Sequence, residues 1–403
     1  MRQELARPLS KPYRQPPEAV VESHIAKSRP VPASRLQEGR SQKEGKNVSV
    51  HWQSYLVAFI IALIVARITV PLARRLAFRL GAVDEPDARK VHDKIMPRLG
   101  GLAIFAGFMC AAAWAVQAQG PYLGIIIGGI IVFAVGALDD VFSLSPWAKL
   151  AGQIVAAAVA VYCGVTVHFM TNPFDGLIYL GKLSMPLTLL WIVGVTNAVN
   201  LVDGLDGLAA GVSGIAALSM GIIAFQQGEP AVALLCLALV GAVLGFLPYN
   251  FHPARIFMGD AGALFLGFVL ACLSVVGLAK SAAVISLFVP IVVLGIPVFD
   301  TFFAIIRRIN KKVPIFAPDK NHLHHRLMAL GFSHRQSVLI IYGISVIFGG
   351  AAVALTYVTS PQATLILALL LVFVVIGARR IGIVSGREVN HSHRYTHMYT
   401  DEH

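Results

Sequence analysis

Two adjacent carboxylates, Asp139 and Asp140, end the apolar run 130–138. Adjacent carboxylates repel each other, so one of them keeps its proton unless a cation or a hydrogen-bond donor lies close by. Such a pair suits a divalent cation, a base that acts on a phosphate group, or both. The alternative is an ordinary acidic loop start after a helix.

A second set of polar groups recurs at a helical spacing within the segment 197–207. Asn197, Asn200 and Asp203 are three residues apart, and Asp206 continues the series. On a helix these side chains share one face, and the glycines of the segment allow a phosphate or a nucleotide to approach the backbone closely. A polar helix cap would explain one aspartate but not four polar groups in register.

Two further connections contain charged groups. The segment 249–262 holds one cation, Arg255, and one carboxylate, Asp260, between two apolar runs. Asp260 precedes a helix start, so capping of that helix is the alternative to a site role. Residues 84–101 form a charged connection that could contact substrate or be a solvated turn. Lys149 could reach a phosphate or extend to the lipid headgroups.

Three histidines lie within four residues of the long connection 301–335. They are His322, His324 and His325, and Arg326 follows them. Histidines at this density could be metal ligands. Their neighbours are basic rather than acidic or thiol, which fits the binding of a phosphorylated substrate better than zinc. A solvated basic loop is the alternative.

The elements that must position these clusters are apolar runs long enough to cross a bilayer. From Ser54 onward such runs alternate with short polar breaks, and about 20 apolar residues span the hydrocarbon as a helix. The predicted fold class is therefore all-α, a polytopic membrane bundle with about eleven transmembrane helices. The predicted spans are 54–73, 99–117, 123–138, 147–168, 185–200, 208–226, 231–248, 261–279, 282–300, 337–358 and 362–378.

Lysine and arginine are distributed unevenly between the breaks. Breaks after odd-numbered spans are rich in cations, whereas those after even-numbered spans hold only Lys182 and Lys280. The positive-inside rule therefore places the odd breaks and the C-terminus in the cytoplasm and the N-terminus outside. The tail 1–50 is an exception, because its ten Lys and Arg residues would prefer the cytoplasm. All five polar clusters lie in odd breaks, so we expect them to converge on one membrane face as a metal–phosphate site.

Composition excludes several other classes of protein. The chain is 56% hydrophobic and only 13% charged, against about a quarter charged in soluble proteins. The net charge of +12 indicates a charged membrane face rather than a nucleic-acid site, because no soluble domain is predicted. The four cysteines lie in apolar runs without metal-ligand spacing, which supports neither a disulfide framework nor a zinc site. The predicted organisation is a disordered polar tail 1–50, a transmembrane domain 51–380 and a cytoplasmic tail 381–403.

Over residues 54–380 the chain resembles the polyprenyl-phosphate N-acetylhexosamine-1-phosphate transferases, and within them the undecaprenyl-phosphate N-acetylglucosaminyl (GlcNAc) 1-phosphate transferases. The histidine motif looks like that of the GlcNAc branch, because the phospho-MurNAc-pentapeptide transferases have three consecutive histidines there. The segments that show the resemblance are Pro86 to His92, Asp139-Asp140, Asn197 to Gly207, Ala254 to Gly262 and His322 to Arg326.

The resemblance implies transfer of GlcNAc-1-phosphate from UDP-GlcNAc to undecaprenyl phosphate, with release of UMP. It implies a Mg²⁺ cofactor, with Mn²⁺ as an alternative. It also implies a location in the bacterial plasma membrane with the site on the cytoplasmic face, as the first membrane step in the synthesis of teichoic acid or a related polymer. The expected partners are UDP-GlcNAc, undecaprenyl phosphate and the lipid bilayer. A homodimer is possible, and nucleic acid is not expected as a partner.

The resemblance also implies roles for individual residues. Asn200 and Asp260 would hold the metal, and Asp139 would position or deprotonate the lipid phosphate with Asp140 beside it. Asp203 and Asp206 would shape the nucleotide site. The expected substrate-binding residues are Lys149, Asn197, Arg255, His322, His324, His325 and Arg326.

Two other functions compete with this one. The same chemistry could act on UDP-MurNAc-pentapeptide or on another UDP-N-acetylhexosamine, with selectivity expected in the segment 301–335. A secondary transporter would also place carboxylates in the membrane, but on broken helices near the midplane and often in repeated halves. The sequence shows no internal repeat, and its polar clusters lie at the ends of the spans.

Overall fold

A computed structural model describes residues 52–84, 95–167, 169–171, 177–278, 288–310, 312 and 322–382. The predicted tail 1–50 lies outside these residues, as do 383–403 of the predicted C-terminal tail. Residues 85–94 of the first charged connection and 313–321 of the histidine connection also lie outside them.

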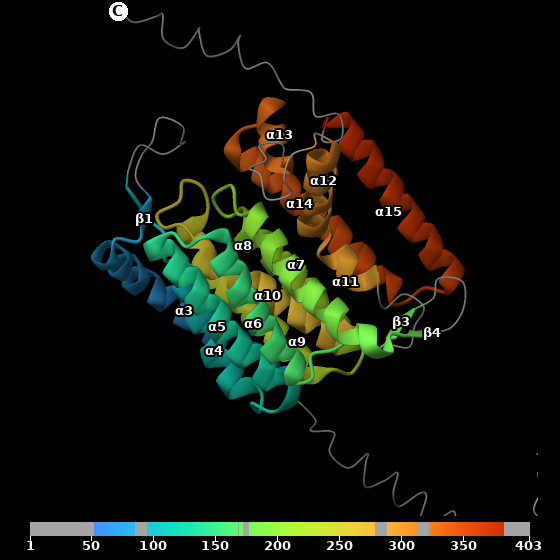
Figure 1. Ribbon diagram of the computed structural model, residues 1–403, viewed down its shortest axis with the longest axis horizontal. Helices are drawn as coiled ribbons and strands as arrows, with labels where there is room; N and C mark the ends of the chain where they lie inside the picture. The colour runs from blue at the N-terminus through green and yellow to red at the C-terminus, as the bar shows by residue number, and fades with distance from the viewer. Residues whose placement is uncertain are drawn as a thin grey trace, which may run out of the picture. The chain divides into compact units, whose positions relative to one another are not determined.

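The described residues are mostly helical (Figure 1). Two short antiparallel hairpins interrupt them: β1 (Val83–Asp84) pairs with β2 (Met96–Pro97), and β3 (Phe169–Thr171) pairs with β4 (Leu177–Tyr179). A 3₁₀ turn, η1, covers Gly181–Leu183. The α-helices are α3 (Trp52–Leu80), α4 (Gly101–Ala115), α5 (Gly120–Phe142), α6 (Pro146–Tyr162), α7 (Ser184–Val202), α8 (Leu208–Gln226), α9 (Pro230–Asn250), α10 (Gly259–Leu278), α11 (Phe288–Val293), α12 (Gly295–Asn310), α13 (Leu323–Ala329), α14 (His334–Leu355) and α15 (Ser360–Arg380).

Eight stretches of helix in the described residues are long and apolar enough to cross a membrane, which confirms a polytopic helical membrane protein. They lie in α3, α5, α8, α9, α10, α14, α15 and in α7 together with η1. Two predicted spans correspond to the shorter helices α4 and α6, of 15 and 17 residues. Each of the eleven predicted runs therefore contains helix.

The ninth predicted run is divided, and its end was predicted wrongly. Its described part forms α11 and α12, which meet at Leu294, while 282–287 lie outside the described residues. The connection predicted to start at 301 begins instead as ten more residues of helix, to Asn310. The end of the helix could not be inferred from hydropathy, because α12 buries polar side chains. Asp300, Arg307 and Arg308 are buried while Phe302 is exposed. Falling hydropathy therefore marks a buried polar face of the helix and not its end.

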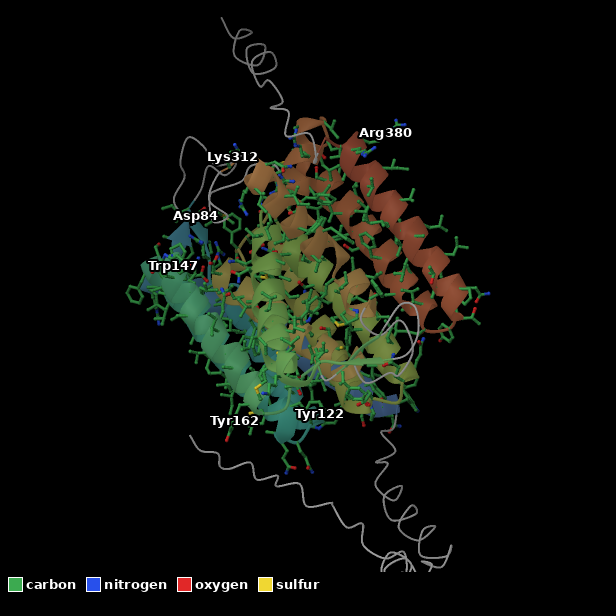
Figure 2. All side chains as sticks on the ribbon, turned by 45° about the vertical axis from the view of Figure 1, so that its right-hand side comes forward. Asp84, Tyr122, Trp147, Tyr162, Lys312 and Arg380 are labelled. Carbon is green, nitrogen blue, oxygen red and sulfur yellow. The ribbon has the colours of Figure 1, made fainter. Side chains whose placement is uncertain are left out.

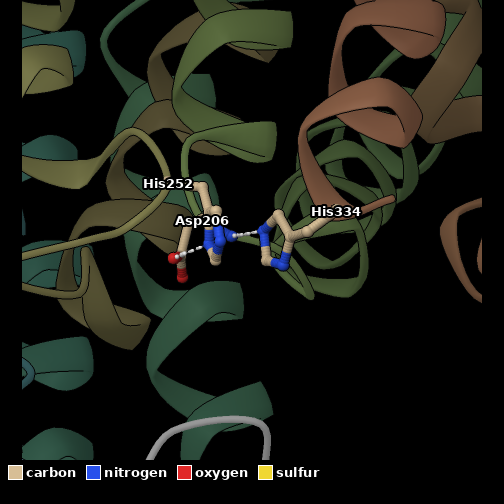
Figure 3. Close-up of side chains that lie close together, drawn as sticks. All are labelled: Asp206, His252 and His334. Atoms are coloured by element: carbon tan, nitrogen blue, oxygen red, sulfur yellow. Dashed lines mark hydrogen bonds and ion pairs between the residues drawn. The ribbon is translucent and has the colours of Figure 1, made fainter. Parts of the chain in front are cut away.

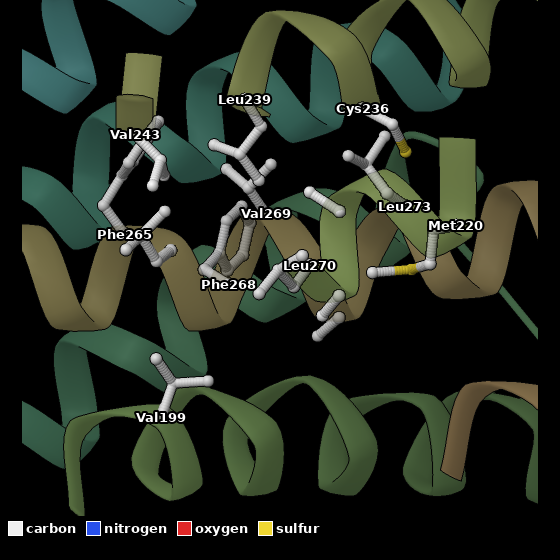
Figure 4. Packing of buried hydrophobic residues seen from close by; sticks show 14 of the residues in the cluster. Val199, Met220, Cys236, Leu239, Val243, Phe265, Phe268, Val269, Leu270 and Leu273 are labelled. Atoms are coloured by element: carbon white, nitrogen blue, oxygen red, sulfur yellow. The ribbon is translucent and has the colours of Figure 1, made fainter. Parts of the chain in front are cut away.

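Helix α10 is the centre of the bundle, packed against α4, α5, α7, α8 and α9. Figure 4 shows Phe268, Val269 and Leu273 of α10 on the side of Leu239 and Cys236 of α9, with Val199 of α7 on the other side of α10. Phe265 and Phe268 are fully buried. A helix that is apolar on every side must be surrounded by other helices, and α10 therefore provides a fixed base for the groups at its first turn.

Small residues bring α3 close to α9. Along α3 the buried positions are almost all alanines, at intervals of three or four residues. A Cβ added to Gly241 or Gly245 of α9 would lie 2.3 or 2.5 Å from a carbonyl oxygen of α3. Close backbone approach through small residues is how membrane helices gain packing energy where lipid offers no hydrophobic contrast.

The polar connections after odd-numbered spans lie at one end of the bundle. Figure 2 shows Asp84, Trp147 and Lys312 toward one end, with Tyr122 and Tyr162 at the opposite end. Arg380, at the end of α15, lies on the same side as Lys312. This arrangement agrees with the prediction that the odd breaks and the end of the last span share one face.

Candidate active site

A cavity of about 340 Å³ lies at the polar end of the bundle. Its walls come from the β1–β2 hairpin, the end of α7 and the turn after it, the connection from α9 to α10, and the start of α14. The lining residues are Asp84, Arg98, Asn200, Asp203, Gly204, Leu205, Asp206, Asn250, Phe257, Met258, Gly259, Asp260 and His334.

An ammonium group bridges two of the carboxylates that the sequence singled out. Lys149 Nζ lies 3.0 Å from Asp139 Oδ2 and 2.9 Å from Asp260 Oδ2. Asn200 donates to the same Asp260 oxygen at 3.5 Å. Four helices thus contribute to one cluster, because α5 and α7 end here and α6 and α10 begin here. The Asp139 and Asp260 side chains are only 9% and 18% exposed.

Asp140 holds the first turn of α10. Its Oδ1 accepts from the Asp260 N–H at 2.9 Å, and its Oδ2 accepts from the Ala261 N–H at 3.0 Å. The first N–H groups of a helix have no partner within that helix, so a carboxylate from α5 acts as their cap. The Asp140 side chain is fully buried, and Arg98 Nη2 lies 3.8 Å from its Oδ1. The two adjacent aspartates therefore have different surroundings.

Glycines allow this close contact between α5 and α10. A Cβ on Gly136 would lie 2.5 Å from the Ala261 Cα atom. Gly259 has φ +74°, and a Cβ there would meet the Arg98 carbonyl oxygen at 2.0 Å. Only glycine adopts such a φ without strain, so the residue before Asp260 is fixed by backbone geometry.

Asp203 ends α7 at the cavity wall. Burial raises the pKa of this carboxyl to about 8, and the charges of Asp260 and Asp140 add to the shift. The protonated form is therefore favoured at neutral pH until a cation approaches. A bound cation reverses this preference, because an opposite charge within a few ångströms favours the carboxylate.

Asp206 is tied to two histidines from other segments (Figure 3). Its Oδ2 lies 2.9 Å from His252 Nδ1 and accepts from the Ala254 N–H at 3.1 Å. Its own N–H donates to His334 Nε2 at 3.0 Å. The two imidazole rings stack with centroids 4.1 Å apart. These bonds hold the turn after α7, the connection after α9 and the start of α14 together.

One group of histidine and acidic ligand atoms in the described residues is close enough together to hold a metal ion. One ligand atom from each of Asp206, His252 and His334 lies within 4.8 Å of the others. The His334 Nε2 lone pair, however, already accepts the Asp206 N–H. Asn200, Asp203 and Asp260 also line the cavity and carry amide or carboxylate oxygens, which makes them an alternative set. Mg²⁺ prefers carboxylate, amide carbonyl and water oxygens, so this second set fits the expected ion better.

The histidine motif is largely buried beside the turn after α7. His322 Nδ1 lies 2.7 Å from Asp300 Oδ2, and the Leu323 N–H donates to Asp300 Oδ1 at 2.9 Å. His324 is 3% exposed, and a Cβ on Gly204 would lie 2.3 Å from its Nε2. Burial and the neighbouring His325 lower the pKa of His324 to about 3, so His324 is neutral at physiological pH.

The remaining predicted site residues differ in their access to the cavity. Asn197 is paired with a buried glutamine, Gln153, and is not among the cavity-lining residues. Arg255 is exposed in the connection between α9 and α10. His325 is exposed and Arg326 buried on α13. The structure thus brings the acidic residues, Lys149 and Asn200 together, while Arg255, His322, His324, His325 and Arg326 are not among the cavity-lining residues.

Sequence reasoning did not select several residues that the structure places at or beside the site. His334 lines the cavity, and Gln153 and Asp300 bond directly to predicted residues. Asp84 and Arg98 also line the cavity, and they belong to the charged connection 84–101 that the sequence did single out. Gln153 gave one usable signal, a polar side chain inside an apolar run. His334 gave no such signal, because it precedes the predicted apolar run, which begins at 337.

The comparisons with known proteins agree with this geometry. Residues 122–278 match the family model described as glycosyl transferase family 4. This stretch includes the acidic residues from Asp139 to Asp260. A membrane-embedded glycosyl transferase is therefore the class of protein that the fold and site define.

Similar proteins of known name narrow the family. The chain is 47% identical over 82% of its length to a probable undecaprenyl-phosphate N-acetylglucosaminyl 1-phosphate transferase of Bacillus subtilis, of which it covers 93%. It is 38% identical over 79% of its length to a decaprenyl-phosphate N-acetylglucosaminephosphotransferase of Mycobacterium tuberculosis, covering 86%. It is 32% identical over 67% of its length to an undecaprenyl-phosphate α-N-acetylglucosaminyl 1-phosphate transferase of Yersinia pestis, covering 76%. The chain belongs to the polyprenyl-phosphate N-acetylhexosamine-1-phosphate transferases within glycosyl transferase family 4.

Proposed function

We propose that this protein transfers GlcNAc-1-phosphate from UDP-GlcNAc to undecaprenyl phosphate, giving undecaprenyl-diphosphate-GlcNAc and UMP. We place the reaction on the cytoplasmic face of the bacterial plasma membrane, as the first membrane step of a cell-envelope polymer such as teichoic acid. The names of similar proteins support the substrates. The observation on which the proposal mainly rests is the cluster of Asp139, Lys149 and Asp260 at the polar end of the membrane helices.

The position of this cluster suits a reaction between a lipid and a soluble nucleotide. The polyprenyl chain stays in the hydrocarbon while its phosphate lies near the helix ends. The nucleotide sugar enters the cavity from water. Both phosphates then meet where α5, α6, α7 and α10 end or begin, which favours reaction by proximity.

In the proposed reaction an oxygen of the lipid phosphate attacks the phosphorus that bears the sugar. A new P–O bond forms, and the bond from that phosphorus to the UMP oxygen breaks. Asp139 orients the lipid phosphate or accepts its proton. Lys149 lies beside Asp139 and Asp260, where its charge can stabilise phosphate oxygens.

Asn200, Asp203 and Asp260 would hold Mg²⁺, which when bound neutralises the diphosphate and favours departure of UMP. Asp140 positions Asp260 by capping α10. Asp206 shapes the nucleotide side of the cavity together with His334. Arg255, His325 and Arg326 supply cationic or hydrogen-bonding groups for the diphosphate or the sugar.

The test is UMP release by the purified protein in lipid vesicles. We expect release from UDP-GlcNAc only when undecaprenyl phosphate is present and a divalent cation is added. A parallel panel of UDP-sugars, including UDP-MurNAc-pentapeptide, identifies the donor. Faster turnover of another UDP-sugar would overturn the GlcNAc assignment, and uptake of solute without any UMP release would overturn the transferase itself.

A further inference from the structure

Two side-chain amides form a reciprocal pair between α6 and α7. Gln153 Nε2 donates to Asn197 Oδ1 at 3.3 Å, and Asn197 Nδ2 donates to Gln153 Oε1 at 2.5 Å. Gln153 is 3% exposed. An unpaired amide in such surroundings would be costly, so each residue depends on the other for its hydrogen bonds.

The orientation of both amides is determined by a third bond. Asn197 Nδ2 also donates to the Val193 carbonyl oxygen of its own helix at 2.8 Å. The nitrogen of Asn197 must therefore point toward that carbonyl, which leaves its oxygen to accept from Gln153. Both protons of the Asn197 amide are then used within the protein, and they are not available to a substrate.

The pair lies one helical turn from two residues of the candidate active site. Gln153 follows Lys149 by four residues on α6, and Asn197 precedes Asn200 by three on α7. Lys149 and Asn200 both bond to Asp260 Oδ2, at 2.9 and 3.5 Å. Residues three or four apart share a helix face, so the amide pair and the two active-site groups lie along the same contact between α6 and α7.

Apolar contacts alone would not determine the register of these helices sharply. They are non-directional, and each residue of sliding moves a helix by about 1.5 Å. Reciprocal hydrogen bonds are satisfied at one rotation and one height only. Buried polar pairs are known to specify register in packed helices.

We propose that Gln153 and Asn197 are positioning residues, which fix α6 against α7 so that Lys149 and Asn200 both reach Asp260. Neither residue contacts the reacting atoms. This assignment rests on the proposed function, and it gives Asn197 a different role from the substrate contact expected from the sequence. It also assigns a role to Gln153, which no sequence motif indicated.

The test is a double-mutant cycle in the full-length protein, with Gln153→Leu, Asn197→Leu and the double variant. We expect each single change to lower kcat by about 10- to 100-fold, as small displacements of catalytic groups do, while KM for UDP-GlcNAc changes by less than about twofold. The double variant should be no slower than the worse single variant, because both remove the same interaction. The exchange Gln153→Asn with Asn197→Gln should recover activity relative to either single exchange.

A second readout does not depend on turnover. Mn²⁺ binding, followed by electron paramagnetic resonance without substrate, should weaken by about 10-fold in each single variant, because Asn200 no longer approaches Asp260 correctly. Wild-type protein that binds Mn²⁺ but releases no UMP from UDP-GlcNAc would disprove the proposed function while still testing the positioning role.

The control is Ser274→Ala on α10. The Trp191 indole N–H donates to Ser274 Oγ at 3.0 Å between α7 and α10, so this variant removes a partly buried interhelical hydrogen bond made by the same helix α7. We expect it to leave kcat and Mn²⁺ affinity unchanged. The proposal is overturned if Asn197→Leu raises KM while Gln153→Leu has no effect, if the two effects on kcat simply add, or if Ser274→Ala reproduces them.

Discussion

The carboxylate cluster around Asp260 and the histidine motif on α13 contain residue types suited to the same phosphate chemistry, yet the fold treats them differently. Asp139 and Asp260 share one ammonium group at the edge of a cavity. His322 is bonded to Asp300, and His324 is buried against Gly204. Asp260 lines the cavity, whereas none of the histidine-motif residues is among its lining residues. Placement in the fold, and not residue type, therefore decides which polar groups a ligand in this cavity can reach.

Two adjacent residues also differ in their partners. Asp139 accepts from Lys149 and from the Leu144 N–H just after α5, whereas both oxygens of Asp140 accept from N–H groups of α10. Charge and sequence position are nearly identical for the two aspartates. Their partners differ because a helix turns about 100° per residue, so neighbours face different helices.

Asp260→Asn should have the largest effect. The change removes the negative charge to which both Lys149 and Asn200 donate. It also removes a ligand of the proposed cation. We expect kcat to fall by about 1,000-fold or more, as when a key electrostatic group is lost. UMP release measured at saturating Mg²⁺ checks this, and near-normal turnover would show that the carboxylate cluster is not the reactive region.

Asp140→Asn should have the second largest effect on kcat. Its effect on stability should also differ from that of Asp139→Asn. The amide can accept only one of the two α10 N–H bonds, so we expect about 100-fold lower kcat and a loss of about 1–2 kcal/mol in stability. Asp139→Asn should lower kcat without the same drop in thermal stability. Equal stability losses in the two variants would mean that the two aspartates do not differ as described.

Gly204→Ala should have an intermediate effect through the histidine motif. The new Cβ would lie 2.3 Å from His324 Nε2, and the buried ring has little room to move. We expect the turn that holds Asp203 to shift and kcat to fall by about 10-fold. Gly194→Ala on α7 is the matched control, because no atom lies within 4 Å of a Cβ there. If both variants were fully active, the contact between α13 and this turn would not be needed for activity.

The last prediction concerns the pH dependence of the wild-type protein. Asp203 has a pKa raised to about 8, so below that pH a cation must displace a proton from it. Apparent Mg²⁺ affinity should therefore rise with pH between about 6 and 8, by at most about 10-fold per unit, and level off above the raised pKa. Asp203→Asn should flatten this dependence. An apparent Mg²⁺ affinity that falls as pH rises would contradict the displacement of a proton from Asp203 by the cation.

Most of the fold could be predicted from the sequence, because lipid imposes one simple rule on the helices that cross it. Every predicted apolar run contains helix, and the polar clusters lie at one end of the bundle. The division of the ninth run and the extension of α12 could not be predicted, since they depend on which face of α12 is buried. Hydropathy alone does not report that face.

The candidate site could be predicted as a set of residues but not as a set of roles. Asp139, Asn200 and Asp260 were identified from spacing and residue type, and the structure places them together. The pairing of Asn197 with Gln153 and of Asp140 with α10 could not be predicted, because both partners come from segments distant in sequence. Local patterns do not show which long-range hydrogen bonds will form.

The central claim is that the divalent cation is held by the oxygen atoms around Asp260. Mn²⁺ titration by electron paramagnetic resonance on wild type, Asp260→Asn and His252→Ala tests this most directly. We predict that the bound Mn²⁺ signal is lost in Asp260→Asn and retained in His252→Ala. The opposite pattern would place the ion on Asp206, His252 and His334, and would contradict the account.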